Sequence, residues 1–156
     1  MTNQPTLILF VTNQPMLVAG FCDALHLAGF DAEPLMLNRR DAFAALRRED
    51  ACLIFADARQ APAHATLAEA VRSSPQSRFV LCGSNITPEM LQTAVDSCLH
   101  GVLSTSLPAE EAAAALTRIW QGERQFRFGG RVGYAAPPPP PTGSDFDAEW
   151  MFGHAV

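Results

Sequence analysis

The stretch LILFVTNQPML, residues Leu7–Leu17, decides the fold. A run of apolar residues is followed by the polar Thr12 and Asn13, and Pro15 stands where a helix can begin. A strand that is buried on both faces is a continuous apolar run, and proline is favoured at the first position of a helix. The stretch therefore predicts a buried strand that passes through a polar corner into a helix.

Length and composition are those of one soluble domain. The chain has 156 residues, of which 48% are hydrophobic and 17% are charged. This balance is typical of a globular protein with one core. No apolar run approaches the roughly 20 residues of a membrane span, and the N-terminus lacks the positive flank and cleavage site of a signal peptide. We therefore expect a cytoplasmic protein without a membrane partner.

Charge and residue types exclude several functions. The formal net charge of −5 argues against a nucleic-acid partner, because phosphate binding needs a basic face. All eleven basic residues are arginine, so no reaction can use a lysine amine. The cysteines and histidines lack the spacing of a zinc site, and we expect no bound metal. They are Cys22, Cys52, Cys82, Cys98, His26, His64, His100 and His154.

Apolar runs of strand length recur along the first 105 residues. The runs that are apolar throughout are typical of strands buried on both faces of a parallel sheet. Two others, which are weaker, are also expected to be strands. In chain order the five expected strands are Thr6–Val11, Glu33–Leu37, Cys52–Ala56, Arg78–Gly83 and Gly101–Thr105.

Segments with helical spacing separate these strands and follow the last of them. Thr87 and Ser106 are expected to cap the last two helices, because each precedes a proline that can stand near the first helical position. Each helix should bury one stripe of side chains. The stripes are Leu17, Phe21 and Leu25; Phe43, Leu46 and Arg47; Leu67, Ala70 and Val71; Met90, Leu91 and Val95; and Leu116, Ile119 and Trp120.

Five alternations of strand and helix predict a doubly wound α/β fold. Right-handed crossovers and the flavodoxin-like strand order 2-1-3-4-5 suit this length. In that topology the ligand crevice lies outside the C-terminal ends of the first and third strands. Those ends are Thr12–Asn13 and Asp57.

From about Pro5 to Phe126 the chain resembles the receiver domains of two-component response regulators, particularly the NarL/FixJ type. LILFVTNQPML resembles the family's first strand, in which an apolar run precedes Asp-Asp-His-Pro, and LIFADAR (53–59) resembles its third. SRFVLCGS (77–84) resembles the fourth strand, and residues 99–126 resemble the stretch from the Gly-Tyr-Leu-Leu-Lys motif to the end of the domain. The resemblance implies a flavodoxin-like five-stranded parallel sheet and a role in bacterial signal transduction.

Most of the family's catalytic set is missing from the matching positions. Asp57 falls on the phospho-accepting aspartate. Thr12 and Asn13 occupy the positions of the two Mg²⁺-binding acids. Gly83 occupies the position of the switch hydroxyl, with Ser84 next to it, and Thr105 occupies the position of the lysine. Phosphoryl transfer depends on positioning and on charge neutralisation by metal and cationic groups. The resemblance therefore implies a degenerate pocket in which Asp57 is a strand-end carboxylate and Thr12 and Asn13 close the site with neutral hydrogen bonds.

These residues favour a pseudo-receiver, which is not an enzyme, has no cofactor and acts through contact with a protein partner. By family analogy the partner would contact residues around Leu91, Leu103 and Leu107–Trp120. One alternative is a single-domain response regulator that is still phosphorylated on Asp57 in a phosphorelay, with weak Mg²⁺ binding. Another is a sensor that binds an apolar ligand or a nucleotide in the vacated crevice.

The C-terminal part of the chain has a different composition. We expect residues 1–127 to form the receiver-like domain and residues 128–156 to be a linker and tail. Pro137–Pro141 should form a stiff polyproline II spacer. Beyond it, aromatic and apolar residues lie among acids and are candidates for binding a partner protein or another copy as a homodimer; the alternative is a disordered terminus. The candidates are Phe146, Trp150, Met151 and Phe152.

Overall fold

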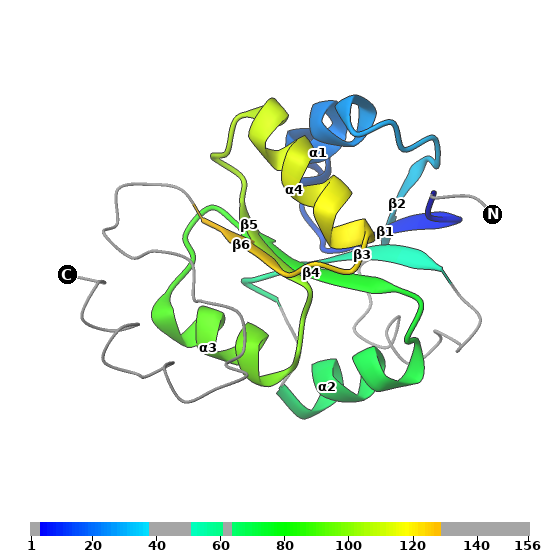
Figure 1. Ribbon diagram of the computed structural model, residues 1–156. Helices are drawn as coiled ribbons and strands as arrows, with labels where there is room; N and C mark the ends of the chain where they lie inside the picture. The colour runs from blue at the N-terminus through cyan, green and yellow to red at the C-terminus, as the bar shows by residue number, and fades with distance from the viewer. Residues whose placement is uncertain (1–3, 38–50, 61–63, 129–156) are drawn as a thin grey trace, which may run out of the picture.

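The computed structural model describes residues 4–37, 51–60 and 64–128. Strands and helices alternate along the chain around a single parallel sheet (Figure 1). The strands are β1 Leu7–Val11, β2 Pro34–Leu37, β3 Cys52–Asp57, β4 Arg78–Gly83, β5 Gly101–Ser104 and β6 Gln125–Arg127. The helices within the described residues are α1 Pro15–Leu27, α2 His64–Ser73, α3 Pro88–Asp96 and α4 Ala109–Trp120.

The strand order is β2-β1-β3-β4-β5-β6, and every pair of neighbours is parallel. This confirms the doubly wound fold and the predicted order 2-1-3-4-5. The sheet has six strands instead of the five that we predicted, because β6 pairs with β5. Gly101 allows this close approach, since a Cβ there would lie 2.5 Å from Ile119 Cδ1 and 3.0 Å from the Gln125 carbonyl oxygen.

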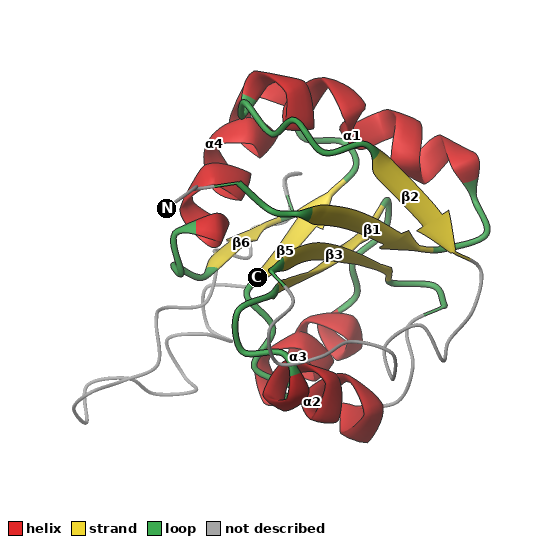
Figure 2. Cartoon of the chain, turned by 90° about the vertical axis from the view of Figure 1, so that its right-hand side faces the viewer, coloured by secondary structure: helices red, strands yellow, loops and turns green. Residues whose placement is uncertain are grey.

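The sheet lies between two layers of helices. Figures 1 and 2 show α1 and α4 on one face and α2 and α3 on the other. The sheet buries apolar side chains on both faces, which explains why its central strands are apolar throughout. Beneath α1, the Phe10 and Phe55 rings stack with centroids 4.3 Å apart, and Phe21 lies 5.2 Å from Phe55. This packing fixes the first and third strands side by side, so their C-terminal ends form one corner.

The helix termini confirm one predicted cap and correct another. Thr87 caps α3, because its hydroxyl accepts a hydrogen bond from the Met90 N–H at 3.2 Å. The predicted Ser106 cap is wrong: α4 begins after Pro108 without a side-chain cap, and the Ser106 hydroxyl lies 2.7 Å from that of Ser104. The expected helix with Phe43, Leu46 and Arg47 lies outside the described residues.

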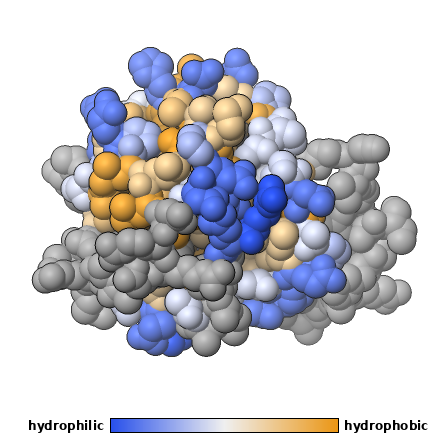
Figure 3. Space-filling model, turned by 180° about the vertical axis from the view of Figure 1, so that it is seen from behind, coloured by the Kyte–Doolittle hydropathy of each residue, from blue (hydrophilic) through white to orange (hydrophobic). Residues whose placement is uncertain are grey.

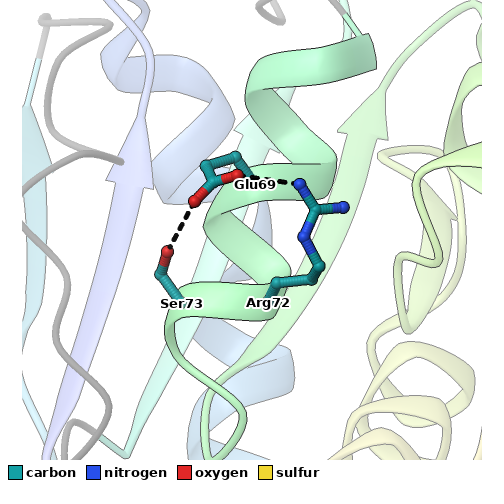
Figure 4. A network of polar contacts seen from close by, with 3 residues as sticks. All are labelled: Glu69, Arg72 and Ser73. Atoms are coloured by element: carbon teal, nitrogen blue, oxygen red, sulfur yellow. Dashed lines mark hydrogen bonds and ion pairs between the residues drawn. The ribbon is translucent and has the colours of Figure 1, made fainter.

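The surface carries a small charged network on α2. Glu69 pairs with Arg72 at 2.8 Å and accepts a hydrogen bond from the Ser73 hydroxyl at 3.4 Å (Figure 4). Both side chains are well exposed, Arg72 to 67% and Glu69 to 69%, and exposed ion pairs contribute little to stability. We therefore assign this network no role in the site.

Exposed apolar side chains gather on α1 and β2, and Figure 3 shows apolar surface beside hydrophilic surface on the face seen there. These side chains are Met16, Leu27, Leu35, Met36 and Leu37. Leu37 ends β2 and directly precedes residues 38–50, which lie outside the described part of the chain. Among the described residues, no helix is long and apolar enough to span a bilayer.

Candidate functional site

The candidate site lies where β1 and β3 end side by side. Thr12 directly follows β1, and Asp57 is the last residue of β3. The two strands are paired so that Val11 lies opposite Ala56. The next two residues, Thr12 and Asp57, therefore lie side by side at the C-terminal edge of the sheet, where ligands of such folds bind.

Thr12 and Asp57 form a buried hydrogen-bonded pair. The Thr12 hydroxyl donates to Asp57 Oδ2 at 2.6 Å, and the same hydroxyl accepts the Gln14 N–H at 3.0 Å. Both residues are buried, with 1% and 3% of their surfaces exposed. A hydrogen bond to an ionised carboxylate is shorter and stronger than one between neutral groups. Thr12 thus provides Asp57 with a neutral donor and itself carries no charge.

The loop after β3 supplies a second hydrogen bond to the Asp57 carboxylate. The Arg59 N–H donates to Asp57 Oδ1 at 2.9 Å, so each carboxylate oxygen has a donor. The Gln60 side-chain amide donates to Asn13 Oδ1, which ties this loop to the corner after β1. Asn13 thus bonds to a second amide, and this contact between two uncharged side chains lies at the surface.

The end of β4 forms the third side of the corner. Cys82 lies opposite Asp57 in the sheet and is fully buried. Burial, and secondarily the Asp57 charge, raises the pKa of the Cys82 thiol well above its usual value, and the thiol donates to the Ala56 carbonyl at 3.6 Å. A thiol in this state is a neutral packing group, because the thiolate is the reactive form.

Gly83 holds the position at which the family has its switch hydroxyl. A Cβ on Gly83 would lie 3.1 Å from the Ala58 Cβ and 3.6 Å from Ile86 Cδ1, so Ala58 and Ile86 close the space beside it. Ser84, the neighbouring hydroxyl, is exposed beyond the end of β4. The Thr105 N–H donates to the Gly83 carbonyl at 3.0 Å, which places Thr105 beside β4 but supplies no cation.

Among the described residues, the groups that donate hydrogen bonds to the Asp57 carboxylate are uncharged. Mg²⁺ prefers several oxygen ligands and is usually held by carboxylates together with substrate phosphates. Within the described residues, no cluster of three or more His, Cys, Asp or Glu side chains could hold a metal ion. Asp57 is thus a buried carboxylate that is held by a hydroxyl and a backbone N–H.

The structure brings together most of the predicted pocket residues. Thr12 contacts Asp57 directly, Asn13 joins through Gln60, and Gly83 and Thr105 are bonded to each other at the neighbouring strand ends. Ser84 is exposed instead. The predicted partner-binding side chains Phe146, Trp150, Met151 and Phe152 lie outside the described residues.

Sequence reasoning missed two residues of the corner. No motif in the sequence analysis included Gln60. Its position three residues after Asp57 was the only sign that it belongs to the same loop. From the sequence, Cys82 was considered only among the cysteines that lack the spacing of a zinc site. Once β3 and β4 are paired, the register that sets Cys82 opposite Asp57 reveals its place at the site.

Comparison with known proteins identifies the fold. No family model and no curated protein matches the chain. The isolated receiver domain of RcsB from Salmonella enterica serovar Typhimurium superposes with a TM-score of 0.62 at 15% identity, covering 78% of this chain and 92% of that one. The receiver domain of the response regulator NarL from Mycobacterium tuberculosis gives 0.61 at 18% identity, covering 77% and 99%. A LuxR-family DNA-binding response regulator from Silicibacter pomeroyi gives 0.60 at 23% identity, covering 78% and 95%.

These three structures come from response regulators. The chain therefore has the flavodoxin-like receiver fold, as its sequence predicted. Identities at this level show the fold alone, and a fold hosts many functions, so function must be argued from the site.

Proposed function

We propose that this chain is a pseudo-receiver that acts through protein contacts in a bacterial cytoplasmic signalling or regulatory pathway, without phosphorylation. The observation that supports this proposal is the Asp57 carboxylate, which is held by the Thr12 hydroxyl and the Arg59 N–H. A neutral hydroxyl stands where a metal-binding acid would be needed. The protein is proposed to have no enzymatic activity, metal or cofactor.

The charge argument favours this function over phosphorylation. Phosphoryl transfer is accelerated by metal ions and cationic side chains that neutralise the developing charge. Thr12, Asn13 and Thr105 supply neither, and Gly83 has no hydroxyl to contact an acyl phosphate. Phosphorylation of Asp57 is retained as a second candidate function, because Asp57 ends β3 at the position that the family uses as phospho-acceptor.

The proposed partner surface consists of α3 and α4. The family analogy placed the partner near Leu91, Leu103 and Leu107–Trp120, but the Leu91 and Leu103 side chains are buried, and β6 lies along the edge of β5. A partner on this side would therefore contact exposed residues of α3 and α4. The C-terminal Phe146, Trp150, Met151 and Phe152 are the second proposed contact, with a partner or with another copy.

Beryllofluoride or acetyl phosphate with Mg²⁺ tests the proposal. We expect no phosphoryl adduct by intact-mass measurement and no change in tryptophan fluorescence, since Thr105 stands where the family has its lysine and cannot supply a positive charge. Asp57→Asn is the matched control for any response. A stoichiometric adduct or a saturable fluorescence change that Asp57→Asn abolishes would establish the phosphorylated alternative instead.

Pull-down of the intact protein tests the interaction part of the proposal. We expect a partner to be retained equally by the wild type and by Asp57→Asn, because binding does not require phosphorylation. Loss of that partner in Asp57→Asn, with the fold intact by circular dichroism, would contradict the proposal. A screen of nucleotides and apolar ligands by thermal shift separates the sensor alternative, because a ligand that binds the folded state raises its unfolding temperature.

A further inference from the structure

β6 forms one edge of the sheet in the described part of the chain. It is the last strand in the order, and within the described residues no strand pairs beyond it. The Gln125 N–H donates inward to the His100 carbonyl at 3.0 Å. Because successive N–H groups of a strand point to opposite sides, the Phe126 N–H and C=O are directed at the open edge, where another strand can pair with them.

The two faces of β6 differ in character. Phe126 is buried in the core between the sheet and α2 and α3, and Phe128 packs against the same cluster. Gln125 and Arg127 alternate with them and therefore lie on the face that carries α4. Arg127 is exposed and forms no ion pair within the described part of the chain. A strand added at this edge would find aromatic surface on one face and a cation on the other.

The sequence of the C-terminal segment alternates with the period of a strand. In DFDAEWMF, residues 145–152, the acids Asp145, Asp147 and Glu149 occupy odd positions. The even positions hold apolar residues, namely Phe146, Ala148, Trp150 and Phe152. Alternation of polar and apolar residues indicates a strand with one buried face, and here it runs from Asp145 to Trp150 and ends at the apolar Met151. The segment would thus present an acidic face and an aromatic face to opposite sides of a sheet.

We propose that residues 145–152 add to the open edge of β6 in the same molecule as a seventh strand. The aromatic face would continue the Phe126 and Phe128 surface, and the acidic face would lie on the side of Arg127. Backbone pairing would supply affinity, and the match of the two faces would fix the orientation, as in other cases of strand addition. The proposal concerns the chain's own sheet and does not rest on the proposed function. It replaces the contact of this segment with a partner or another copy by a contact within one molecule.

The connecting chain permits this return to the sheet. Residues 129–144 separate the end of the described chain from the segment. Sixteen residues reach at most about 55 Å, whereas three residues of β6 span about 10 Å. Pro137–Pro141 would extend about 15 Å as polyproline II, which leaves eleven residues for turns. A tethered segment has an effective concentration of about 1 mM, which favours docking within one molecule over docking between two.

Amide hydrogen exchange in the full-length chain tests this proposal. We expect the Phe126 amide to be protected in the wild type. The double substitution Asp147→Ala with Ala148→Asp keeps composition and net charge but places a carboxylate on the aromatic face. In that variant we expect Phe126 exchange to accelerate at least tenfold. The Gln125 amide, which is bonded to His100, should stay equally protected in both proteins and reports that the domain remains folded.

Matched variants and dilution make the outcome decisive. Asp147→Glu with Ala148→Val changes the same two positions but keeps the alternation, and it should retain Phe126 protection. Arg127→Glu should accelerate Phe126 exchange several-fold, because it opposes the acidic face. Rapid Phe126 exchange in the wild type, or equal protection in both double variants, would overturn the proposal. Protection that disappears on hundredfold dilution would overturn docking within one molecule, because it would show that the segment comes from a second copy.

Discussion

The residue on which the site depends is Thr12, because its hydroxyl holds Oδ2 of the buried Asp57 at 2.6 Å. Thr12→Val removes this donor and keeps the side-chain volume. A hydrogen bond to a charged group contributes about 1.5–3 kcal/mol, so we expect the free energy of unfolding in urea to fall by about 2 kcal/mol. Thr12→Ser retains the hydroxyl and is the matched control. Equal losses in the two variants would contradict the assigned role.

His100 makes stability depend on pH. Its Nδ1 accepts the Phe79 N–H at 3.0 Å; burial, and then Arg78 and Arg124, lowers its pKa to about 4 from the ordinary 6.5. The folded protein therefore keeps His100 neutral where the unfolded chain binds a proton. The stability that the neutral His100 contributes is fully present above about pH 6.5 and is lost as the pH falls towards 4. One pKa unit corresponds to about 1.4 kcal/mol of unfolding free energy, so the loss amounts to about 3 kcal/mol in total.

Urea unfolding of the wild type and of His100→Asn between pH 7 and pH 4 measures this contribution. Carboxylates also titrate in this range, so the relevant quantity is the difference between the two proteins. We expect the wild type to lose more stability than the variant as the pH falls. If the two proteins lose the same unfolding free energy as the pH falls, protonation of His100 is not the cause of the loss.

The C-terminus of α3 is strained at Cys98. This exposed residue adopts φ 62° directly after the cap, where the Cys98 N–H bonds to the Val95 carbonyl. Glycine is the preferred residue at this left-handed position. We expect Cys98→Gly to raise the urea midpoint by the equivalent of about 0.5–1 kcal/mol. Cys22→Gly is the matched control, because Cys22 is an exposed cysteine inside α1, where glycine should destabilise by about 1 kcal/mol. The same sign for both variants would contradict this explanation.

The sequence predicted the elements whose burial leaves a periodic or apolar pattern. β1, β3 and β4 are apolar because both sheet faces are covered, and the Thr87 cap of α3 was predicted from its hydroxyl and the proline after it. β6 was missed, because three residues are too few to show alternation and its pairing depends on space above Gly101. The Ser106 cap was wrong, because the Ser104 hydroxyl, a nearer partner, competes for it.

The site was predicted less completely than the elements. That Thr12 and Asp57 share one corner followed from strand order alone. The pairing of Asn13 with Gln60 depends on how the loop after β3 folds back, which no periodic pattern encodes. The position of Cys82 beside Asp57 depends on the register between β3 and β4, and a shift of one residue would turn this side chain to the other face.

For the whole molecule, fold and chemistry are separable. Phe10, Phe55 and Phe79 belong to the apolar cores on the two faces of the sheet, and no charged group in the corner contributes to that packing. The receiver fold therefore forms in this chain with Thr12 and Asn13 at the positions where the resemblance places metal-binding acids.

This separation predicts that metal binding can be restored on the unchanged scaffold. Thr12→Asp with Asn13→Asp places three acids at the corner, so we expect lower stability without metal and a Mg²⁺-dependent rise in melting temperature. At ten times the dissociation constant, Mg²⁺ should stabilise the variant by about 1.4 kcal/mol, or roughly 3–6 °C. The wild type and a neutral control, Thr12→Asn, should show no rise, and adding Asp57→Asn to the variant should reduce it. A Mg²⁺-dependent rise of equal size in the wild type would refute the charge deficit that we assign to this corner.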